Sequence, residues 1–339
     1  MDGYVPGEQP GDPAVVKLNT NENPYPPAPG VLEVLQRVQV QDLIKYPDPM
    51  CAALRARLAE MHGCKPENVF VGNGSDEVLA LCTRAFVEND GAIGYFDPSY
   101  SLYSVLADIR GVERRPVPLG EEFAWCSPPQ DTAPLFFLTN PNAPTGILYA
   151  RDLLRPFCNG FRGIVVLDEA YVDFSDEDCM PLALAGENVL VARTLSKAYS
   201  LAGIRLGYAV GPAPLIGALH KIKDSYNVNV LSQALALAAL SDREHMQRNV
   251  DRVRATRGRM SRELAGMDFD VTPSQTNFLW VRPRAMPAPE LFAELKAARI
   301  YVRHFPGETT GDYLRITVGT DEDVDTLLAT IRSLQKKRG

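Results

Sequence analysis

The sequence predicts an α/β fold, in which a large domain with a mostly parallel sheet is followed by a small α+β domain. Two observations support this prediction. Short runs of Val, Ile, Leu and Phe alternate with helical patterns over the first two thirds of the chain, and such runs are typical of parallel strands buried on both faces. Beyond about residue 240 the pattern changes to a long charged helix and two separated strands. The length of 339 residues also suits a large domain joined to a smaller one.

The chain divides into three predicted parts. Residues 1–29 are rich in Pro, Gly and Asn and show no steady period, so we expect an extended arm. Residues 30–240 are expected to form the large domain, and residues 241–339 the small one. Strands are predicted at 69–71, 92–95, 135–139, 164–167, 189–192, 206–210, 277–281, 300–302 and 313–318, and Arg303 is expected to end the strand 300–302. Helices are predicted from residue 31, where Val31, Leu32 and Leu35 share a face, and at 54–61, 78–86, 100–108, 242–265, 288–299 and 321–335.

The composition argues against several classes of protein. A net charge of −7 disfavours nucleic acid or an anionic membrane as the main partner. No apolar run approaches the roughly 20 residues that span a bilayer, and the first residues lack the pattern of a signal peptide. The six cysteines form no C-x-x-C pair and do not cluster with the four histidines, so no metal site is expected. These features predict a cytoplasmic protein with reduced thiols.

Lys197 is the first candidate for chemistry. It lies just beyond the buried strand 189–192, and ligands of open α/β sheets bind at the carboxyl ends of the strands. Burial lowers the pKa of a lysine, which can then attack an aldehyde as a neutral amine. Taken alone, a lysine after a strand is more often an ordinary surface residue, so the prediction depends on the motifs around it.

A second motif follows another buried strand. Asp168 comes directly after residues 164–167, where a carboxylate can pair with a protonated pyridine nitrogen and keep the ring cationic. Tyr171 is close enough in the chain to reach the phenolic oxygen of the same ring. The alternative for Asp168 is a helix N-cap, which the residue alone does not exclude.

A third motif suits a phosphate group. Gly74, Ser75 and Asp76 open a helix directly after the strand 69–71, and backbone N–H groups at a helix N-terminus bind phosphate well. The segment is not G-x-G-x-x-G and no Walker lysine follows, so a dinucleotide or a nucleoside triphosphate is disfavoured. Ser196 and Arg205, on either side of Lys197, could complete the phosphate site. The proline-rich loop 140–146 forms a further stiff turn after a strand.

Together these motifs resemble those of the fold-type I aminotransferases, which use pyridoxal 5′-phosphate. The motifs at 72–77, 140–146, 168–171, 196–197 and 205 occur in the order and spacing of that family, and the likeness runs from about Asn19 to the C-terminus. Within it, the chain is most similar to the histidinol-phosphate aminotransferases, on residues 18–25, 46–48, 194–205 and 313–320. The resemblance implies amino transfer from histidinol phosphate to 2-oxoglutarate, giving imidazole acetol phosphate and glutamate in histidine biosynthesis, by a homodimer with shared active sites.

The same resemblance implies roles for individual residues. Lys197 would hold the cofactor as a Schiff base, Asp168 would bind the pyridine nitrogen, Tyr171 the phenolic oxygen, and Tyr100 would stack on the ring. The phosphate would lie at the segment Gly74, Ser75 and Asp76, with Ser196, Arg205 and, from the partner subunit, Tyr46. The substrates would be bound by Arg315, which takes the glutamate carboxylate, and by Arg303, Tyr25 and Asn23 at the phosphate.

One position departs from the family pattern. The family commonly has an asparagine that contacts the phenolic oxygen where this chain has Ala143. Either Asn142 substitutes for it or Tyr171 acts alone. Two alternative functions within the family share most of the motifs: an aromatic amino acid aminotransferase and a threonine-phosphate decarboxylase. An alternative of another class is a regulator that binds pyridoxal phosphate without turnover. The acidic chain shows no added DNA-binding domain, which disfavours the last of these.

Overall fold

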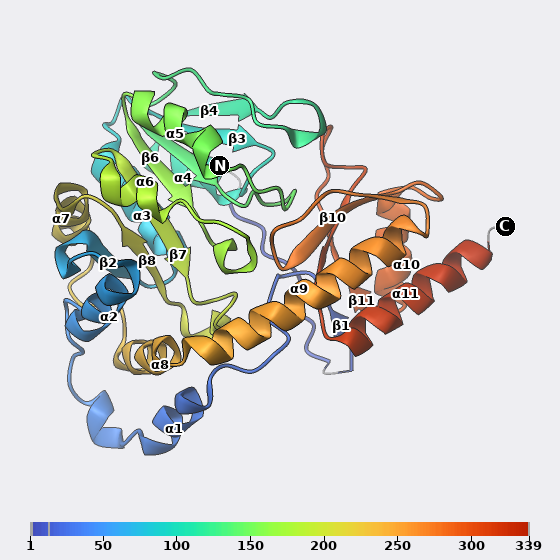
Figure 1. Cartoon of the computed structure of the whole chain (residues 1–339), viewed down its shortest axis with the longest axis horizontal. Coiled ribbons are helices and arrows are strands. Elements are labelled where there is room, and N and C mark those ends of the chain that lie inside the picture. Colours follow the sequence, from blue (N-terminus) through green and yellow to red (C-terminus); the bar gives the residue numbers. More distant parts are fainter. Residues whose placement is uncertain (1–2, 13, 338–339) are drawn as a thin grey trace.

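The computed structural model describes residues 3–12 and 14–337. Of the three sheets in these residues, the two largest lie side by side, the seven-stranded one among the helices on the left of Figure 1 and the four-stranded one on the right. The N-terminal segment runs between them. No helix in the described part of the chain is long and apolar enough to cross a membrane.

The large sheet has seven strands in the order β2-β8-β7-β6-β5-β3-β4. All neighbours are parallel except β8, which is antiparallel to both β2 and β7. The bounds are β2 Val69–Gly72, β3 Ala92–Asp97, β4 Glu113–Pro118, β5 Leu135–Thr139, β6 Ile164–Asp168, β7 Val189–Thr194 and β8 Gly207–Val210. Strands β5 and β7, in the interior of the sheet, are buried along their whole length, which explains their continuous apolar sequences.

Helices cover both faces of this sheet. One face carries α3 Ser75–Phe86, α4 Leu102–Arg110 and α7 Ala213–Ile222, whose apolar side chains pack on those of the sheet. The other face packs with α2 Ala52–His62, α5 Arg151–Gly160, α6 Met180–Ala185 and α8 Val230–Ser241. The result is a three-layer arrangement in which the carboxyl ends of β5, β6 and β7 face the small sheet.

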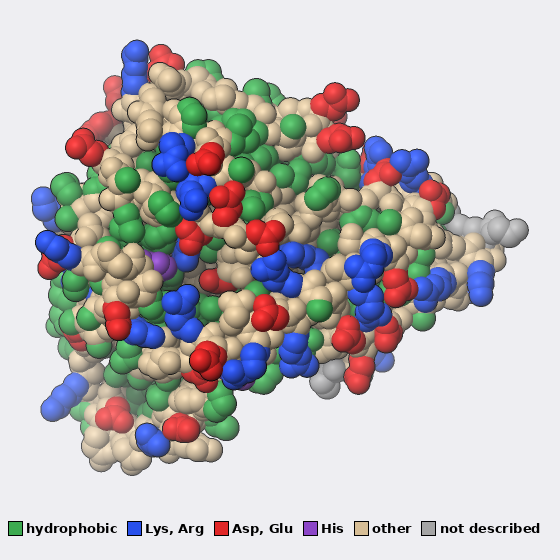
Figure 2. Space-filling view, in the orientation of Figure 1, with side chains coloured by type: hydrophobic (Ala, Val, Ile, Leu, Met, Phe, Trp, Pro, Cys, Tyr) green, Lys and Arg blue, Asp and Glu red, His purple; other side chains and the backbone are tan. Residues whose placement is uncertain are grey.

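The small sheet has four antiparallel strands in the order β12-β13-β10-β9. The elements of this part of the chain are β9 Phe269–Val271, β10 Phe278–Pro283, α10 Ala288–Ala297, β11 Ile300–Tyr301, β12 Arg303–His304, β13 Leu314–Thr317 and α11 Asp321–Lys336, of which β11 lies outside the small sheet. The long helix α9, Arg243–Ala265, crosses from the large part to the small one (Figure 1). Arg254 of α9 pairs with Asp176 of the large part, while Arg259 pairs with Asp321 and Asp325 of α11. Figure 2 shows the acidic and basic side chains interspersed over this face.

The N-terminal arm joins the two parts. Its short strand β1, Val16–Lys17, pairs with β11 in parallel, and the residues after it pass between the two sheets. The arm ends at α1, Pro29–Arg37, which packs against α8 and projects at the bottom of Figure 1. The division of the chain at residues 29 and 240 stays a proposal.

The structure contains every strand and helix that the sequence predicts, with bounds that differ by a few residues. It also contains elements that were not predicted, notably β4 and the two-residue strands β1 and β12. Strand β4 lies at the edge of the sheet and is mostly exposed, so it has no apolar pattern, and it contains Pro116 and Pro118. In α1 only Val31 of the expected apolar face is buried, whereas Leu32 and Leu35 are exposed.

Candidate active site

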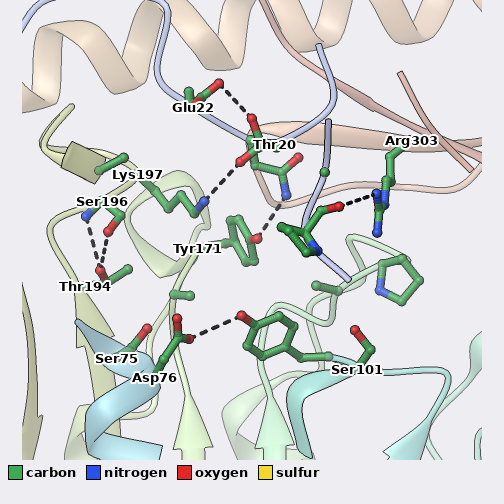
Figure 3. Close-up of a pocket in the computed structure, with 18 of the residues that line it drawn as sticks. Thr20, Glu22, Ser75, Asp76, Ser101, Tyr171, Thr194, Ser196, Lys197 and Arg303 are labelled. Carbon is green, nitrogen blue, oxygen red and sulfur yellow. Dashed lines mark hydrogen bonds between the residues drawn. The ribbon is translucent and has the colours of Figure 1, made fainter. Parts of the chain in front are cut away.

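A cavity of about 420 Å³ lies at the carboxyl ends of β5, β6 and β7. Its walls come from three regions of the chain: the arm, the large sheet with its loops, and the small sheet (Figure 3). Thr139 and Asp168 are register partners at the ends of β5 and β6, and Asp168 is in turn paired with Ala192 of β7. The parallel register therefore brings the polar residues that follow each strand to one edge of the sheet.

Lys197 extends into this cavity from the loop after β7. Its Nζ donates a hydrogen bond to the backbone oxygen of Thr20 in the arm at 3.2 Å and lies 5.8 Å from the centre of the Tyr171 ring. Burial lowers the pKa of Lys197 to about 8, and the positive charge of Arg315 acts in the same direction. The amine is therefore unprotonated in a much larger fraction of molecules near neutral pH than an exposed lysine is.

Asp168 is buried at the floor of the cavity, at the end of β6. Its Oδ2 accepts a hydrogen bond of 2.8 Å from the hydroxyl of Tyr103, which also bonds to Thr139 at 2.6 Å. Its Oδ1 accepts from the backbone N–H of Ala170 at 3.3 Å. Burial raises the pKa of Asp168 to about 6, so a cationic partner in the cavity would strongly favour its charged form.

Tyr171 stands between Lys197 and the small sheet. Its hydroxyl accepts a hydrogen bond from Nδ2 of Asn21 in the arm at 2.9 Å. Its ring meets Phe278 edge to face, and Ala143 belongs to the same buried apolar cluster.

One end of the cavity is built to bind an anion. Helix α3 begins at Ser75, so its N–H groups point into the cavity with Ser75 and Asp76 on the lining. Arg205 reaches the same place and bonds to Asp76 at 3.1 Å and to Ser196 at 3.5 Å. Gly74 has a φ of 87°, and a Cβ there would lie 2.8 Å from Nη2 of Arg205, so the close approach requires glycine.

The opposite end contains two arginines from the small sheet. Arg303 of β12 and Arg315 of β13 are direct cross-strand partners. Arg315 lies between the rings of Phe278 and Phe305, and its Nη2 donates to the backbone oxygen of Asn19 at 3.1 Å. Its buried Nε has no acceptor among the described residues. Arg303 donates to the backbone oxygens of Val5 and Pro6, so the start of the arm covers this arginine.

Comparison with known proteins identifies the family. A family model for aminotransferases of class I and II matches residues 13–331. The chain belongs to the class I and II aminotransferases. A histidinol-phosphate aminotransferase of Synechocystis sp. is 42% identical over 99% of this chain and 96% of its own length, and one of Syntrophotalea carbinolica is 43% identical over 98% and 97%. The crystal structure of histidinol-phosphate aminotransferase from Sinorhizobium meliloti in complex with pyridoxal 5′-phosphate superposes with a TM-score of 0.86, at 28% identity over 94% of this chain and 91% of that one.

These findings confirm the predicted fold type and the predicted cofactor of the family. The cavity of this aminotransferase fits pyridoxal 5′-phosphate in its chemistry, because it offers a lysine amine for the aldehyde and a buried carboxylate for the ring nitrogen. A helix N-terminus with two serines and an arginine suits the phosphate. Beyond the space for the cofactor, the unpaired Nε of Arg315 suits an anionic group of a substrate.

The aminotransferase cavity brings most of the predicted site residues together. Those on its lining are Ser75, Asp76, Tyr100, Asp168, Tyr171, Ser196, Lys197, Arg205, Arg303 and Arg315. Tyr100 lies over the cavity with its hydroxyl bonded to Asp76 at 3.2 Å. Arg303 differs from expectation in one respect. We expected it to end the strand that contains Ile300, but it begins the separate strand β12, because the chain changes partner from β1 to β13 at this point.

Among the described residues, five predicted ones do not line the cavity. Gly74 lies behind Ser75. Asn142 is buried and donates to the oxygen of Pro98 and to Thr145, so its side chain is already used within its own loop region. Asn23 donates to the backbone oxygens of Lys197 and Ala198 and thus supports the lysine loop. Tyr25 is covered by Arg252, 3.6 Å from its ring centre, and Tyr46 is 79% exposed.

Sequence reasoning missed several residues that the structure places at the site. Thr20 and Asn21 lie in the arm motif 18–25, for which we predicted no role at these two positions, and they contact Lys197 and Tyr171. Tyr103 lies on the buried face of a predicted helix. A buried tyrosine normally finds a partner for its hydroxyl, and this was the signal available in the sequence. Phe305 follows β12 in a loop, where no sequence pattern marks it.

Proposed function

We propose that this aminotransferase transfers the amino group of histidinol phosphate to 2-oxoglutarate, in histidine biosynthesis. The main support is the pair Arg303 and Arg315, which lies at the end of the cavity opposite α3. Among the described residues, the buried Nε of Arg315 has no hydrogen-bond partner. A donor with a phosphate group and an acceptor with two carboxylates both need such groups, because a guanidinium binds either anion with two hydrogen bonds. The similarity to proteins named histidinol-phosphate aminotransferase over nearly the whole chain supports the proposal.

We assign the cofactor-binding roles as follows. Asp168 pairs with the ring nitrogen, Tyr171 faces the phenolic oxygen, and Tyr100 stacks on the ring. Ser75, Ser196 and Arg205 hold the phosphate, with the N-terminus of α3. When bound, pyridoxal 5′-phosphate supplies an electron-withdrawing ring that stabilises negative charge at the carbon carrying the amino group.

Lys197 is the proposed general base. A lysine with a pKa of about 8 is close to the operating pH, so it can take a proton from the substrate carbon and return it. The backbone oxygen of Thr20 holds the amine toward the arm, and Asn23 fixes the loop that contains it. These contacts limit the search of a flexible side chain for its reactive position.

We propose a cytoplasmic homodimer with shared active sites. Seven large apolar residues of α1 and the segment after it are exposed, each over 40% to 79% of its surface. They are Leu32, Leu35, Val40, Leu43, Ile44, Tyr46 and Met50. A monomer rarely leaves so many neighbouring apolar side chains in water. Tyr46 stacks on Tyr226 with ring centres 4.3 Å apart, so its ring is held at this surface, where it could reach the phosphate site of a second subunit.

A donor screen tests the proposed substrate. With 2-oxoglutarate as acceptor, kcat/KM should be highest for histidinol phosphate and much lower for histidinol, phenylalanine and threonine phosphate. The variant Arg303→Ala should have a lower kcat/KM for histidinol phosphate, since a charged contact to the phosphate is removed. The decrease should correspond to a loss of about 2–4 kcal/mol in transition-state stabilisation. Arg299→Ala is the matched control, because this exposed arginine also contacts the arm, through Asp12, but lies outside the cavity.

The result can exclude the proposal. Equal activity on histidinol and histidinol phosphate would contradict a phosphate-binding role for the arginines. A preference for phenylalanine would favour an aromatic aminotransferase, and loss of carbon dioxide from threonine phosphate would favour the decarboxylase.

A further inference from the structure

The loop asparagine that this family commonly directs at the phenolic oxygen is Ala143 in this chain, and its methyl group packs with Tyr171 and Phe278. Asn142 does not compensate, because its amide nitrogen already donates to Pro98 and Thr145. The large domain therefore offers no loop amide at this point. The arm does offer one, in Asn21.

We propose that Asn21 is a positioning residue that acts through Tyr171 and performs the function that Ala143 cannot. This inference rests on the proposed cofactor site. Asn21 would hold the Tyr171 hydroxyl in place and turn its proton toward the phenolic oxygen of the cofactor.

The orientation of the Asn21 amide follows from its neighbours. The backbone N–H of Asn21 can only donate, and it donates to the Thr317 hydroxyl oxygen at 3.0 Å. The proton of that hydroxyl is then free for the Asn21 side chain, whose Oδ1 accepts it at 3.0 Å. Nδ2 must therefore face the other way, toward Tyr171, at 2.9 Å.

The direction of the bond between Asn21 and Tyr171 determines whether the Tyr171 hydroxyl can donate its own proton. An amide nitrogen is a donor, so the Tyr171 oxygen accepts and its own proton remains available. Within residues 3–12 and 14–337 no acceptor takes that proton, and Tyr171 lines the cavity. The hydroxyl is thus prepared to donate to an oxygen in the cavity. Burial raises the pKa of Tyr171, whereas Arg315 and the Asn21 amide lower it, so both partners increase its strength as a donor.

The backbone of Asn21 is held as firmly as its side chain. Its φ is 56°, in the left-handed region that asparagine tolerates better than most residues, and its carbonyl accepts from Asn277 at 2.9 Å. Only 1% of the residue is exposed. Such a buried, fully bonded and left-handed asparagine indicates a fixed position that the surrounding structure stabilises.

A pH titration of the bound cofactor tests the proposal. A donor beside the phenolic oxygen stabilises negative charge there and lowers the pH at which the visible absorption band titrates. Asn21→Gly removes the amide while keeping the left-handed backbone, and should raise this midpoint by roughly one pH unit. Asn21→Asp keeps the shape but turns a donor into an acceptor, and should raise it at least as much. Asn249→Ala removes another buried amide that bonds the arm, at the backbone oxygen of Pro26 and outside the cavity, and should leave the midpoint unchanged.

Two combinations distinguish action through Tyr171 from a general loss of structure. In a Tyr171→Phe background, which itself should raise the midpoint, adding Asn21→Gly should change nothing further. Adding Ala143→Asn to Asn21→Gly should restore at least half of the shift, since it supplies an amide from the loop. Independent shifts in the double variant, or no rescue, would overturn the proposal.

Failure of the proposed function and failure of the proposed role of Asn21 give different results. If the wild-type chain forms no visible band that borohydride fixes on Lys197, the proposed function fails and this inference fails with it. If the band forms and titrates, but Asn21→Gly leaves its midpoint at the wild-type value, only the role of Asn21 is overturned.

Discussion

At the scale of single residues, burial and the neighbouring charges together set the pKa of Lys197. Burial is the largest influence and lowers the pKa, and Arg315 and Arg205 act in the same direction, while Glu22 and Asp76 oppose them. The arginine that we propose to bind substrate thus also favours the neutral form of the lysine. Under that proposal, substrate recognition and lysine reactivity are coupled through one guanidinium.

This coupling predicts a pH dependence. Only the neutral amine attacks an aldehyde, so cofactor capture by the cofactor-free chain should speed up as the pH rises through about 8. Methionine has a similar length to arginine but no charge. Replacing Arg315 by methionine therefore removes the positive charge and should raise that midpoint by roughly half a pH unit to one pH unit. Arg284→Met, at an exposed arginine paired with Asp270, should not move it. The rate of absorbance change after mixing with pyridoxal 5′-phosphate measures both, and a wild-type midpoint above 10 would contradict a desolvated lysine.

At the scale of elements, the sequence predicts the central strands well because burial on both faces leaves a continuous apolar pattern. It fails for β4, where exposure removes the pattern, and for β1 and β12, which are too short to have one. Site residues that directly follow strands, such as Asp168 and Lys197, could be found for the same reason. Thr20 and Asn21 could not be given roles, because their contacts are with residues more than a hundred positions away.

The start of α3 carries an element-scale prediction. Gly74 combines φ 87° with ψ 162°, a region that is essentially restricted to glycine, and its missing side chain makes room for Arg205. Gly74→Ala should therefore destabilise the fold by about 1–3 kcal/mol and also displace the guanidinium, which should weaken cofactor binding about tenfold or more.

Gly63 provides the matched control for this prediction. It also has a positive φ, 64°, at the end of α2, but a Cβ there meets nothing within 4 Å. Gly63→Ala should lower the free energy of unfolding by about 1 kcal/mol and leave the cofactor dissociation constant unchanged. Thermal unfolding and cofactor titration of both variants separate backbone strain from the contact with Arg205. Unchanged cofactor affinity in Gly74→Ala would exclude the proposed fit.

At the scale of the whole molecule, three separate regions of the chain complete one cavity. The large sheet provides Asp168 and Lys197, the small sheet provides the two arginines, and the arm contacts both through Thr20 and Asn21. A fourth region, from α1 to Met50, is apolar and exposed, and Tyr46 within it lies outside the cavity of its own chain. The exposure of this apolar region and the position of Tyr46 are both explained if the region packs on a second subunit and Tyr46 belongs to the site of that subunit.

Mixing two impaired variants tests whether subunits share sites. Lys197→Ala should be inactive, and Tyr46→Phe should be impaired because a hydroxyl to the cofactor phosphate is lost. In a hybrid dimer, the site that keeps Lys197 receives its Tyr46 from the other chain and is complete, while the second site lacks both. After statistical exchange, an equimolar mixture should thus reach about a quarter of wild-type activity per chain, above the mean of the two separate variants if Tyr46→Phe retains little activity. Exchange is verified with differently tagged chains. If tagged hybrids form and the activity equals that mean, each cavity is completed within its own chain, and the exposed surface around Tyr46 has another purpose.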